Sequence, residues 1–149
     1  MLFESLNRVG VAVYDIDQAI ADFQDLFGAE FYGPFDDPDV GIKVTTPKHL
    51  GLEFVSPQRP DDKIGTTKIL EQFGEGLTAV CWKVSDIEEA EKRLIEAGLT
   101  PMTKMQHGPM KETVFMPCKK SHGLTIVINE FPDTNGLGME SARYFGAEL

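Results

Sequence analysis

Two segments of the chain carry the same pattern of apolar and polar residues, about half a chain length apart. The run from Val13 to Ala19 aligns with the run from Val84 to Ala90, and each follows an apolar, strand-like stretch. Each run opens a helix-like stretch that ends near a glycine, Gly28 in the first copy and Gly98 in the second. Because a repeated pattern of this kind marks a repeated structural unit, the sequence predicts two related modules.

Asp15 and Asp86 stand where the two helices are expected to begin. An aspartate side chain accepts hydrogen bonds from the free N–H groups of a first helical turn, so both residues are predicted to be N-caps. The apolar positions that follow recur at spacings of three and four, which places them on one buried stripe of each helix. These positions are Ile16, Ala19, Ile20, Phe23 and Leu26 in the first helix, and Ile87, Ala90, Leu94 and Ala97 in the second.

Strand-like stretches follow each helix, at 30–33, 40–46 and 50–56 in the first half and at 100–106, 112–116 and 124–131 in the second. Both halves therefore follow the order β-α-β-β-β, which predicts an α+β fold. We expect one domain over 1–149, with modules at about 5–57 and 76–131. A connector at 58–75 would hold a short helix at 66–73, and a tail would follow from 132 to 149.

Composition and charge narrow the classes of partner. The formal net charge of −10 argues against nucleic-acid binding, which needs clustered Lys and Arg to neutralise phosphates. No apolar stretch approaches the ~20 residues of a membrane-spanning helix, and the N-terminus has no signal-like pattern, so we expect a cytoplasmic protein without membrane contact. The two cysteines, Cys81 and Cys118, form neither a disulfide framework nor a zinc-site spacing, and we expect free thiols.

The two-module pattern, together with the stretches 8–13, 76–87, 115–116 and 122–124, resembles the vicinal oxygen chelate superfamily. This superfamily includes glyoxalase I, extradiol dioxygenases, bleomycin-binding proteins and methylmalonyl-CoA epimerase, and the local sequence is most similar to the epimerase. The resemblance implies that the strands form a curled, cup-shaped mixed sheet that holds a small molecule. It also implies a homodimer.

In that superfamily four side chains hold a divalent metal inside the cup. The resemblance carries these four positions onto Arg8, Glu53, Ala79 and Val127. A guanidinium is always protonated and has no lone pair to donate, and Ala and Val offer no ligand atom. Glu53 is the one ligand type that remains, so we expect no metal and no other cofactor.

Strand alternation predicts which residues line the cup, because residues two apart share one face of a sheet. The predicted lining, here called the cup face, combines small and apolar side chains with a few polar groups, as is typical of ligand pockets. It comprises Arg8, Gly10, Ala12, Gly51, Glu53, Val55, Ala79, Cys81, Lys83, Thr125, Val127 and Asn129. We expect ligand contacts from its polar members Arg8, Glu53, Cys81, Thr125 and Asn129.

Arg8 and Glu53 are expected to face each other, and two interpretations of the pair stay open. In the first, they orient a polar group of the ligand, and Arg8 supplies the positive charge that a metal would otherwise bring to an enolate or carboxylate. In the second, they form a salt bridge that fills a vestigial metal site. Pairing is expected in both cases, because a buried carboxylate without a partner is costly.

Other candidates lie in predicted loops or strand ends. Asp39 falls where the resemblance implies a carboxylate that acts as proton-transfer base, although the acidic stretch 36–39 also suits a plain turn. His107 could line the mouth of the cup and contact the ligand, or it could be a solvated loop histidine. His122 is expected in the turn before the last strand, and with His49 and His107 it forms no metal-ligand spacing.

Three functions are therefore compared. The favoured one is a metal-independent isomerase or lyase that acts on a carbonyl compound or acyl thioester by proton transfer through Glu53 or Asp39 beside Arg8. The second is a non-catalytic binding protein of the bleomycin-resistance kind. The third, a metal-dependent epimerase or dioxygenase, lacks three of its four ligands. A carboxylate with a raised pKa in an open cup would favour the enzyme, and a Glu53 locked to Arg8 would favour the binding protein.

Overall fold

The computed structural model describes residues 1–48, 51–59, 61, 65–132 and 142–147. His49 lies outside the described residues. The first half contains β1 (Phe3–Ala12), α1 (Ile16–Phe27), β2 (Phe31–Asp37), β3 (Ile42–Pro47) and β4 (Leu52–Pro57). A connecting helix, α2 (Gly65–Phe73), leads to the second half, which contains β5 (Gly76–Val84), α3 (Ile87–Glu96), β6 (Pro101–His107), β7 (Met110–Phe115) and β8 (Thr125–Glu130). Both halves have the predicted β-α-β-β-β order.

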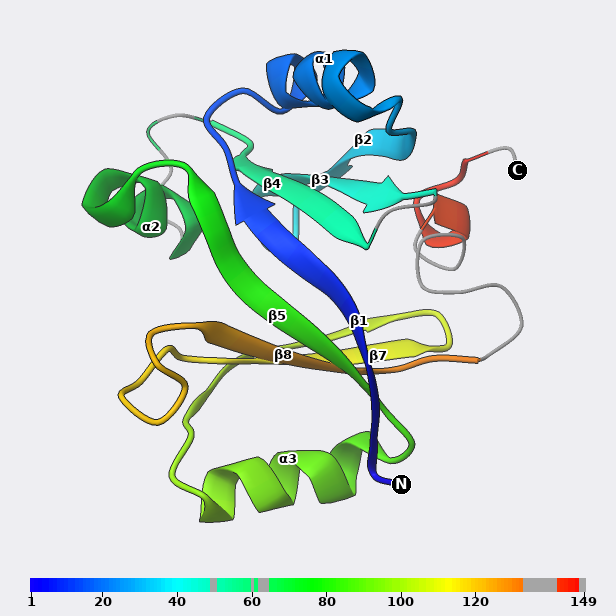
Figure 1. Ribbon diagram of the computed structural model, residues 1–149. Coiled ribbons are helices and arrows are strands. Elements are labelled where there is room, and N and C mark those ends of the chain that lie inside the picture. The colour runs from blue at the N-terminus through cyan, green and yellow to red at the C-terminus, as the bar shows by residue number, and fades with distance from the viewer. Residues whose placement is uncertain (49–50, 60, 62–64, 133–141, 148–149) are drawn as a thin grey trace.

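The strands form an eight-stranded mixed sheet in the order β2-β3-β4-β1-β5-β8-β7-β6. In each module the first strand runs parallel to the last, β1 beside β4 and β5 beside β8. The two modules meet where β1 and β5 pair antiparallel. Figure 1 shows these two strands side by side at the centre, with α1 outside the first module and α3 outside the second. The predicted α+β fold with a curled mixed sheet is confirmed.

Both helices begin at their predicted caps. The Asp15 side chain accepts a hydrogen bond from the Gln18 backbone N–H at 3.0 Å, and Asp86 accepts one from Glu89 at 2.9 Å. Helix α1 ends at Gly28, whose φ of 62° lies in the left-handed region that glycine adopts without strain. These contacts satisfy backbone groups that the helix itself leaves without partners.

Each helix packs its apolar stripe on the outer face of its own module. The cluster under α1 joins Val13, Ile16 and Phe54, and the cluster under α3 joins Ile87, Ala90 and Phe115 among others. The predicted stripe of α3 packs on the core, with Ile87 and Ala90 buried and Leu94 and Ala97 partly buried. In α1 the prediction is wrong for Leu26, which is 65% exposed and lies outside the cluster that holds Ile16 and Phe23.

The strand register places the predicted cup face on the opposite side of the sheet. Directly paired residues point to the same side, and Gly10 pairs with both Glu53 and Ala79. Two residues before Gly10 on β1, Arg8 pairs with Cys81 of β5, and Cys81 in turn pairs with Val127 of β8. Strand alternation therefore places these side chains on the face away from α1 and α3.

One local expectation is corrected at the end of β2. The acidic stretch 36–39 is not wholly a turn, because Asp36 and Asp37 extend β2 and pair with Lys43 and Ile42 of β3. The turn itself covers 38–41. None of the helices in the described part of the chain is long and apolar enough to cross a membrane.

The capping contacts generate a stability prediction. We expect Asp15→Ala and Asp86→Ala each to lower the free energy of unfolding by about 1 kcal/mol, because each removes the acceptor for a first-turn N–H. Urea denaturation measures the change. Asp25→Ala, in the exposed last turn of α1, is the control and should not destabilise the protein, because a carboxylate there opposes the helix dipole. Equal effects at all three positions would contradict the capping role.

Candidate functional site

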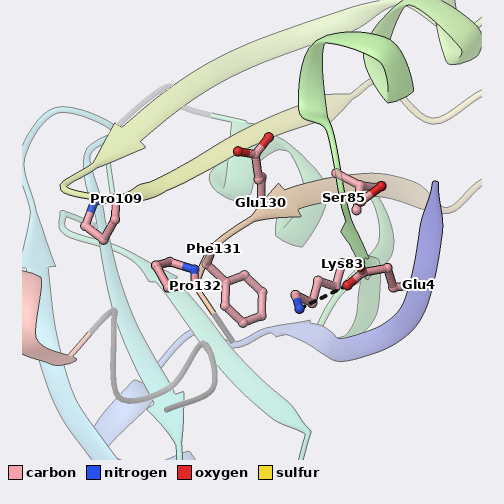
Figure 2. Close-up of a pocket in the computed structure, with 8 residues that line it drawn as sticks. Glu4, Lys83, Ser85, Pro109, Glu130, Phe131 and Pro132 are labelled. Carbon is pink, nitrogen blue, oxygen red and sulfur yellow. Dashed lines mark ion pairs between the residues drawn. The ribbon is translucent and has the colours of Figure 1, made fainter. Parts of the chain in front are cut away.

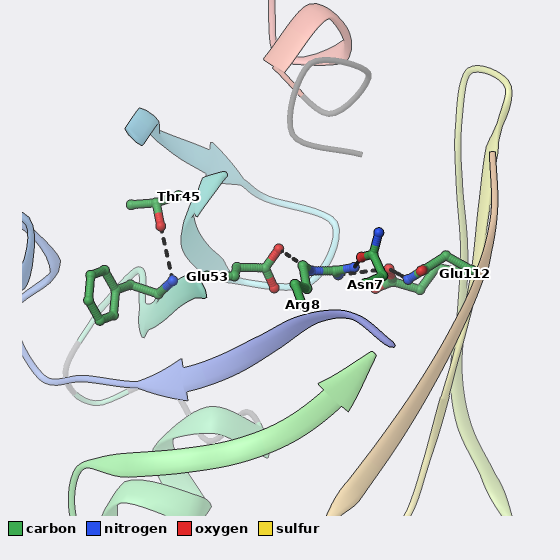
Figure 3. A network of polar contacts seen from close by, with 7 residues as sticks. Asn7, Arg8, Thr45, Glu53 and Glu112 are labelled. Carbon is green, nitrogen blue, oxygen red and sulfur yellow. Dashed lines mark hydrogen bonds and ion pairs between the residues drawn. The ribbon is translucent and has the colours of Figure 1, made fainter. Parts of the chain in front are cut away.

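Arg8 lies at the centre of a buried polar network on the cup face. Its Nε donates to Glu53 Oε2 at 2.7 Å, and its Nη2 donates to Glu112 Oε2 at 2.9 Å. A third bond runs from Nη1 to Asn7 Oδ1 at 3.1 Å. Figure 3 shows Glu53 and Glu112 on opposite sides of the guanidinium. The expected contact between Arg8 and Glu53 is present, and a second carboxylate completes the network.

The curl of the sheet makes this network possible. Arg8 is on β1, and Glu112 is on β7, so strands β5 and β8 lie between them. On a flat sheet these strands would lie roughly 14 Å apart, and side chains that stand perpendicular to the sheet would not meet across that separation. Small Cys81, paired with Arg8 on β5, leaves room on the cup face for the arginine side chain.

The network is almost completely removed from water. The side chains of Arg8, Glu53 and Glu112 are 6%, 12% and 10% exposed. Removing one member of such a buried ion pair costs about 3–5 kcal/mol, because the remaining charge is left without compensation. The three charges therefore depend on one another for their stability.

Burial also sets the protonation behaviour of the site. It raises the pKa of Glu53; the nearby Arg8 charge opposes this effect and the Glu112 carboxylate adds to it. Burial alone would lower the pKa of Arg8, but the carboxylates raise it, so the guanidinium stays charged. Burial raises the pKa of Cys81 to about 12. Cys81 is thus a neutral thiol at physiological pH and no nucleophile, since the thiolate is the reactive form.

Asn129 extends the network and leaves one acceptor open. Its Nδ2 donates to Glu112 Oε2 at 2.8 Å. The side chain is fully buried, yet its Oδ1 finds no hydrogen-bond donor among the described residues. Most buried polar atoms in proteins have a partner, so this oxygen is a position where a bound molecule could donate a hydrogen bond.

The remaining predicted residues are placed as follows. Thr125 is buried and pairs with Ala79 on the cup face. Asp39 is exposed in the turn after β2, and within the described part of the chain no contact joins it to Arg8. Its role as proton-transfer base stays a prediction. His122 is exposed in the turn before β8, as expected.

His107 is buried at the end of β6, so the interpretation as a solvated loop histidine is wrong. Its Nε2 lies 3.7 Å from Asp37 Oδ2, which links β6 and β2, the two edge strands of the sheet. The Tyr144 ring stacks on the imidazole with centroids 4.2 Å apart, and Phe145 stacks on Phe35 at 5.0 Å. The described part of the tail therefore packs where the two edges approach each other.

A surface pocket of about 360 Å³ adjoins the network at the ends of β5 and β8 (Figure 2). Lys83 lines it, and its Nζ lies 3.0 Å from Glu4 Oε2 and 5.2 Å from the centre of the Phe131 ring. Lys83 pairs with Asn129 in the sheet register. The pocket therefore lies next to the strand position of Asn129, but neither Asn129 nor Glu112 lines it.

A divalent metal does not fit the four positions that the superfamily uses. The Arg8 guanidinium, a fixed cation without lone pairs, is bonded to Glu53, and Ala79 and Val127 carry no ligand atoms. Glu112 adds a carboxylate, but both Arg8 and Asn129 donate to it. Across the described ranges, no group of three or more His, Cys, Asp or Glu side chains could hold a metal ion.

Sequence reasoning missed Glu112, Asn7 and Asp37. Glu112 carried a usable signal, because alternation along β7 places it on the face of Met110 and Val114, where a carboxylate needs a partner. Asn7 carried none, since an irregularity in the β1 register between Leu6 and Arg8 accompanies its contact. His107, the partner of Asp37, was predicted as a ligand contact, but its pairing with Asp37 was not predicted.

Comparisons with known proteins agree with the fold. A profile of the Glyoxalase/Bleomycin resistance protein/Dioxygenase superfamily matches residues 7–114. The Ethylmalonyl-CoA/methylmalonyl-CoA epimerase of Cereibacter sphaeroides is 35% identical over 132 residues, covering 84% of this chain and 96% of the relative.

Solved structures of epimerases share the architecture. A variant of Streptomyces coelicolor methylmalonyl-CoA epimerase in complex with 2-nitronate-propionyl-CoA has a TM-score of 0.75 at 17% identity, covering 90% of this chain and 99% of that one. Methylmalonyl-CoA epimerase from Mycobacterium tuberculosis has a TM-score of 0.74 at 24% identity, covering 88% and 90%. These structures share the fold, and the matching profile and the 35% identical relative establish that the chain belongs to the Glyoxalase/Bleomycin resistance protein/Dioxygenase superfamily.

Proposed function

We propose that the protein is an isomerase that removes and returns a proton at the carbon next to the carbonyl of an acyl thioester, without a divalent metal. One observation carries this proposal. The buried Arg8 lies between two carboxylates, Glu53 and Glu112, on the face where the superfamily holds its metal. The thioester class follows from the names of the relatives, which are epimerases of CoA esters.

Arg8 provides the positive charge that an enolate needs. Removing a proton next to a thioester carbonyl places negative charge on the carbonyl oxygen, and a fixed donor aimed at that oxygen lowers the barrier. An arginine has five N–H groups, and the bonds to Glu53, Asn7 and Glu112 use three of them. The guanidinium can therefore hold its carboxylates and still donate to a substrate oxygen.

Glu53 and Glu112 supply the two proton-transfer groups that an epimerase needs. One carboxylate removes the α-proton from one face of the carbon, and the conjugate acid of the other returns a proton to the opposite face. No other bond forms or breaks, so the product is the stereoisomer of the substrate. The raised pKa of Glu53 suits this role, since a carboxyl group that shifts toward neutral pH exchanges protons efficiently.

A second candidate function is binding without chemistry. The short contact between Arg8 and Glu53 favours it, because a carboxylate held in an ion pair is a weaker base. A binding protein would take up its ligand and leave the α-proton in place. Exchange of that proton with solvent therefore distinguishes the two functions.

One prediction concerns Glu53→Gln, which keeps the shape of the side chain and removes the carboxylate that acts as the base. We expect wild-type protein to incorporate deuterium at the α-carbon of methylmalonyl-CoA or another α-methyl thioester in D₂O. The variant should lose about 10²-fold or more in exchange rate. Mass spectrometry of the thioester gives both rates. Glu71→Gln, exposed on α2, controls for the substitution itself.

If wild-type protein binds thioesters but catalyses no exchange, it is a binding protein. If Glu53→Gln exchanges as fast as wild type while folded, Glu53 is not the base. Circular dichroism and gel filtration of the variant establish that it is folded before its rate is interpreted.

A second prediction follows from the raised pKa of Glu53, because the folded protein then holds this proton more tightly than the unfolded chain. The resulting stabilisation is present below the ordinary pKa of 4.5 and is lost as the pH rises through the raised value. The free energy of unfolding of wild type minus that of Glu53→Gln should therefore fall with rising pH. Urea denaturation between about pH 4.5 and 8 measures this difference, and a difference that grows with pH would contradict the raised pKa.

A further inference from the structure

We infer that the substrate carries no charge beside the reacting carbon: it is a thioester whose α-substituent is neutral and can donate a hydrogen bond, rather than a malonyl-type carboxylate. This inference rests on the proposed function and narrows its substrate class. It follows from the charges and the open acceptor on the cup face.

With both carboxylates ionised, the central network holds more negative than positive charge. Arg8 contributes one positive charge, and Glu53 and Glu112, when ionised, contribute two negative charges. The other side chains in contact with the network, Asn7 and Asn129, are neutral amides. A substrate carboxylate placed here would be a third anion around one cation when both glutamates are ionised. It would still give the site a net negative charge when one glutamate is protonated, as proton transfer requires.

The neighbouring charged groups do not reverse this balance. Lys83, the next cation along the cup face, forms an ion pair with Glu4 in the adjoining pocket. Glu130 also lines that pocket (Figure 2), and its Oε2 accepts a hydrogen bond from the Ile87 backbone N–H. Ionised Glu4 and Glu130 therefore offset the charge of Lys83.

Loss of hydration makes this charge imbalance costly for a substrate carboxylate. A carboxylate that leaves water for a buried site needs a cation or several donors to compensate for the lost hydration. A divalent ion would bring two positive charges to such a site, whereas Arg8 brings one and shares it between Glu53 and Glu112. A carboxylate substituent would therefore bind weakly.

Asn129 points to what the site accepts instead. Its buried Oδ1 needs a donor, and a carboxylate has only acceptor atoms. A hydroxyl group carries a donor and no charge, so it satisfies the amide oxygen and adds no repulsion to Glu112. The Asn129 oxygen, which has no donor among the described residues, and the charges of the network thus favour a thioester with a hydroxylated substituent on its α-carbon.

Two thioesters test this inference directly. Methylmalonyl-CoA and 2-methyl-3-hydroxybutyryl-CoA share the CoA group, the thioester and the α-methyl group, and differ in a carboxylate against a neutral hydroxyalkyl group. We expect the hydroxy compound to bind wild-type protein at least about tenfold more tightly by isothermal titration calorimetry, with free CoA as the control. Tighter or equal binding of methylmalonyl-CoA, or binding of neither, would overturn the inference.

The variant Glu112→Gln provides a second test, because it removes one negative charge and keeps the size of the side chain. The affinity ratio should shift by about tenfold toward methylmalonyl-CoA. Glu71→Gln, far from the network in sequence and exposed, should leave the ratio unchanged, and a ratio that Glu112→Gln does not move would contradict the charge argument. If Glu112→Gln does not fold, the wild-type comparison decides alone.

Deuterium exchange at the α-carbon of the same two compounds separates the two proposals. Exchange with a preference for methylmalonyl-CoA would overturn the substrate inference and leave the isomerase proposal intact. Tight binding of the hydroxy compound without exchange in either compound would support the substrate inference and contradict the isomerase.

Discussion

The ion pairs of Arg8 with Glu53 and Glu112 are the interaction on which the rest of the site depends. They join side chains from β1, β4 and β7, and they require the sheet to curl until strands three apart come within reach. Buried charges of this kind contribute little net stability, yet breaking one is costly, so they fix the relative positions of the strands that carry them. The small Cys81 beside Arg8 and the amide of Asn129 complete the surroundings that hold the guanidinium in place.

We propose that an arginine at this position changes the chemistry of an architecture that this chain shares with its superfamily. A divalent ion polarises an oxygen as a Lewis acid, and it needs lone-pair donors in its coordination sphere. A guanidinium needs acceptors instead, and Glu53, Glu112 and Asn7 are all acceptors. The ligand set is thus consistent with an organic cation in the cup. The same fold can host this arrangement because the strands that position the side chains do not depend on which cation lies between them.

The sequence predicted the features that depend on local pattern. The duplicated βαβββ order and the caps at Asp15 and Asp86 follow from periodicity. The pairing of Arg8 with Glu53 follows from the resemblance to the vicinal oxygen chelate superfamily and from the cost of an unpaired buried charge. Glu112 could not be placed, because its contact crosses two intervening strands and depends on the curvature of the sheet. His107 was misjudged in part because Tyr144, which stacks on it, lies in a tail without a periodic apolar pattern.

The central claim, that Arg8 takes the place of a metal, is tested most directly by elemental analysis of the purified protein combined with thioester exchange before and after exhaustive chelation. An organic cation in the cup predicts far less than about one divalent ion per chain, and exchange that chelation does not change. About one tightly held ion per chain, with exchange lost on chelation and restored when the ion is returned, would contradict the claim.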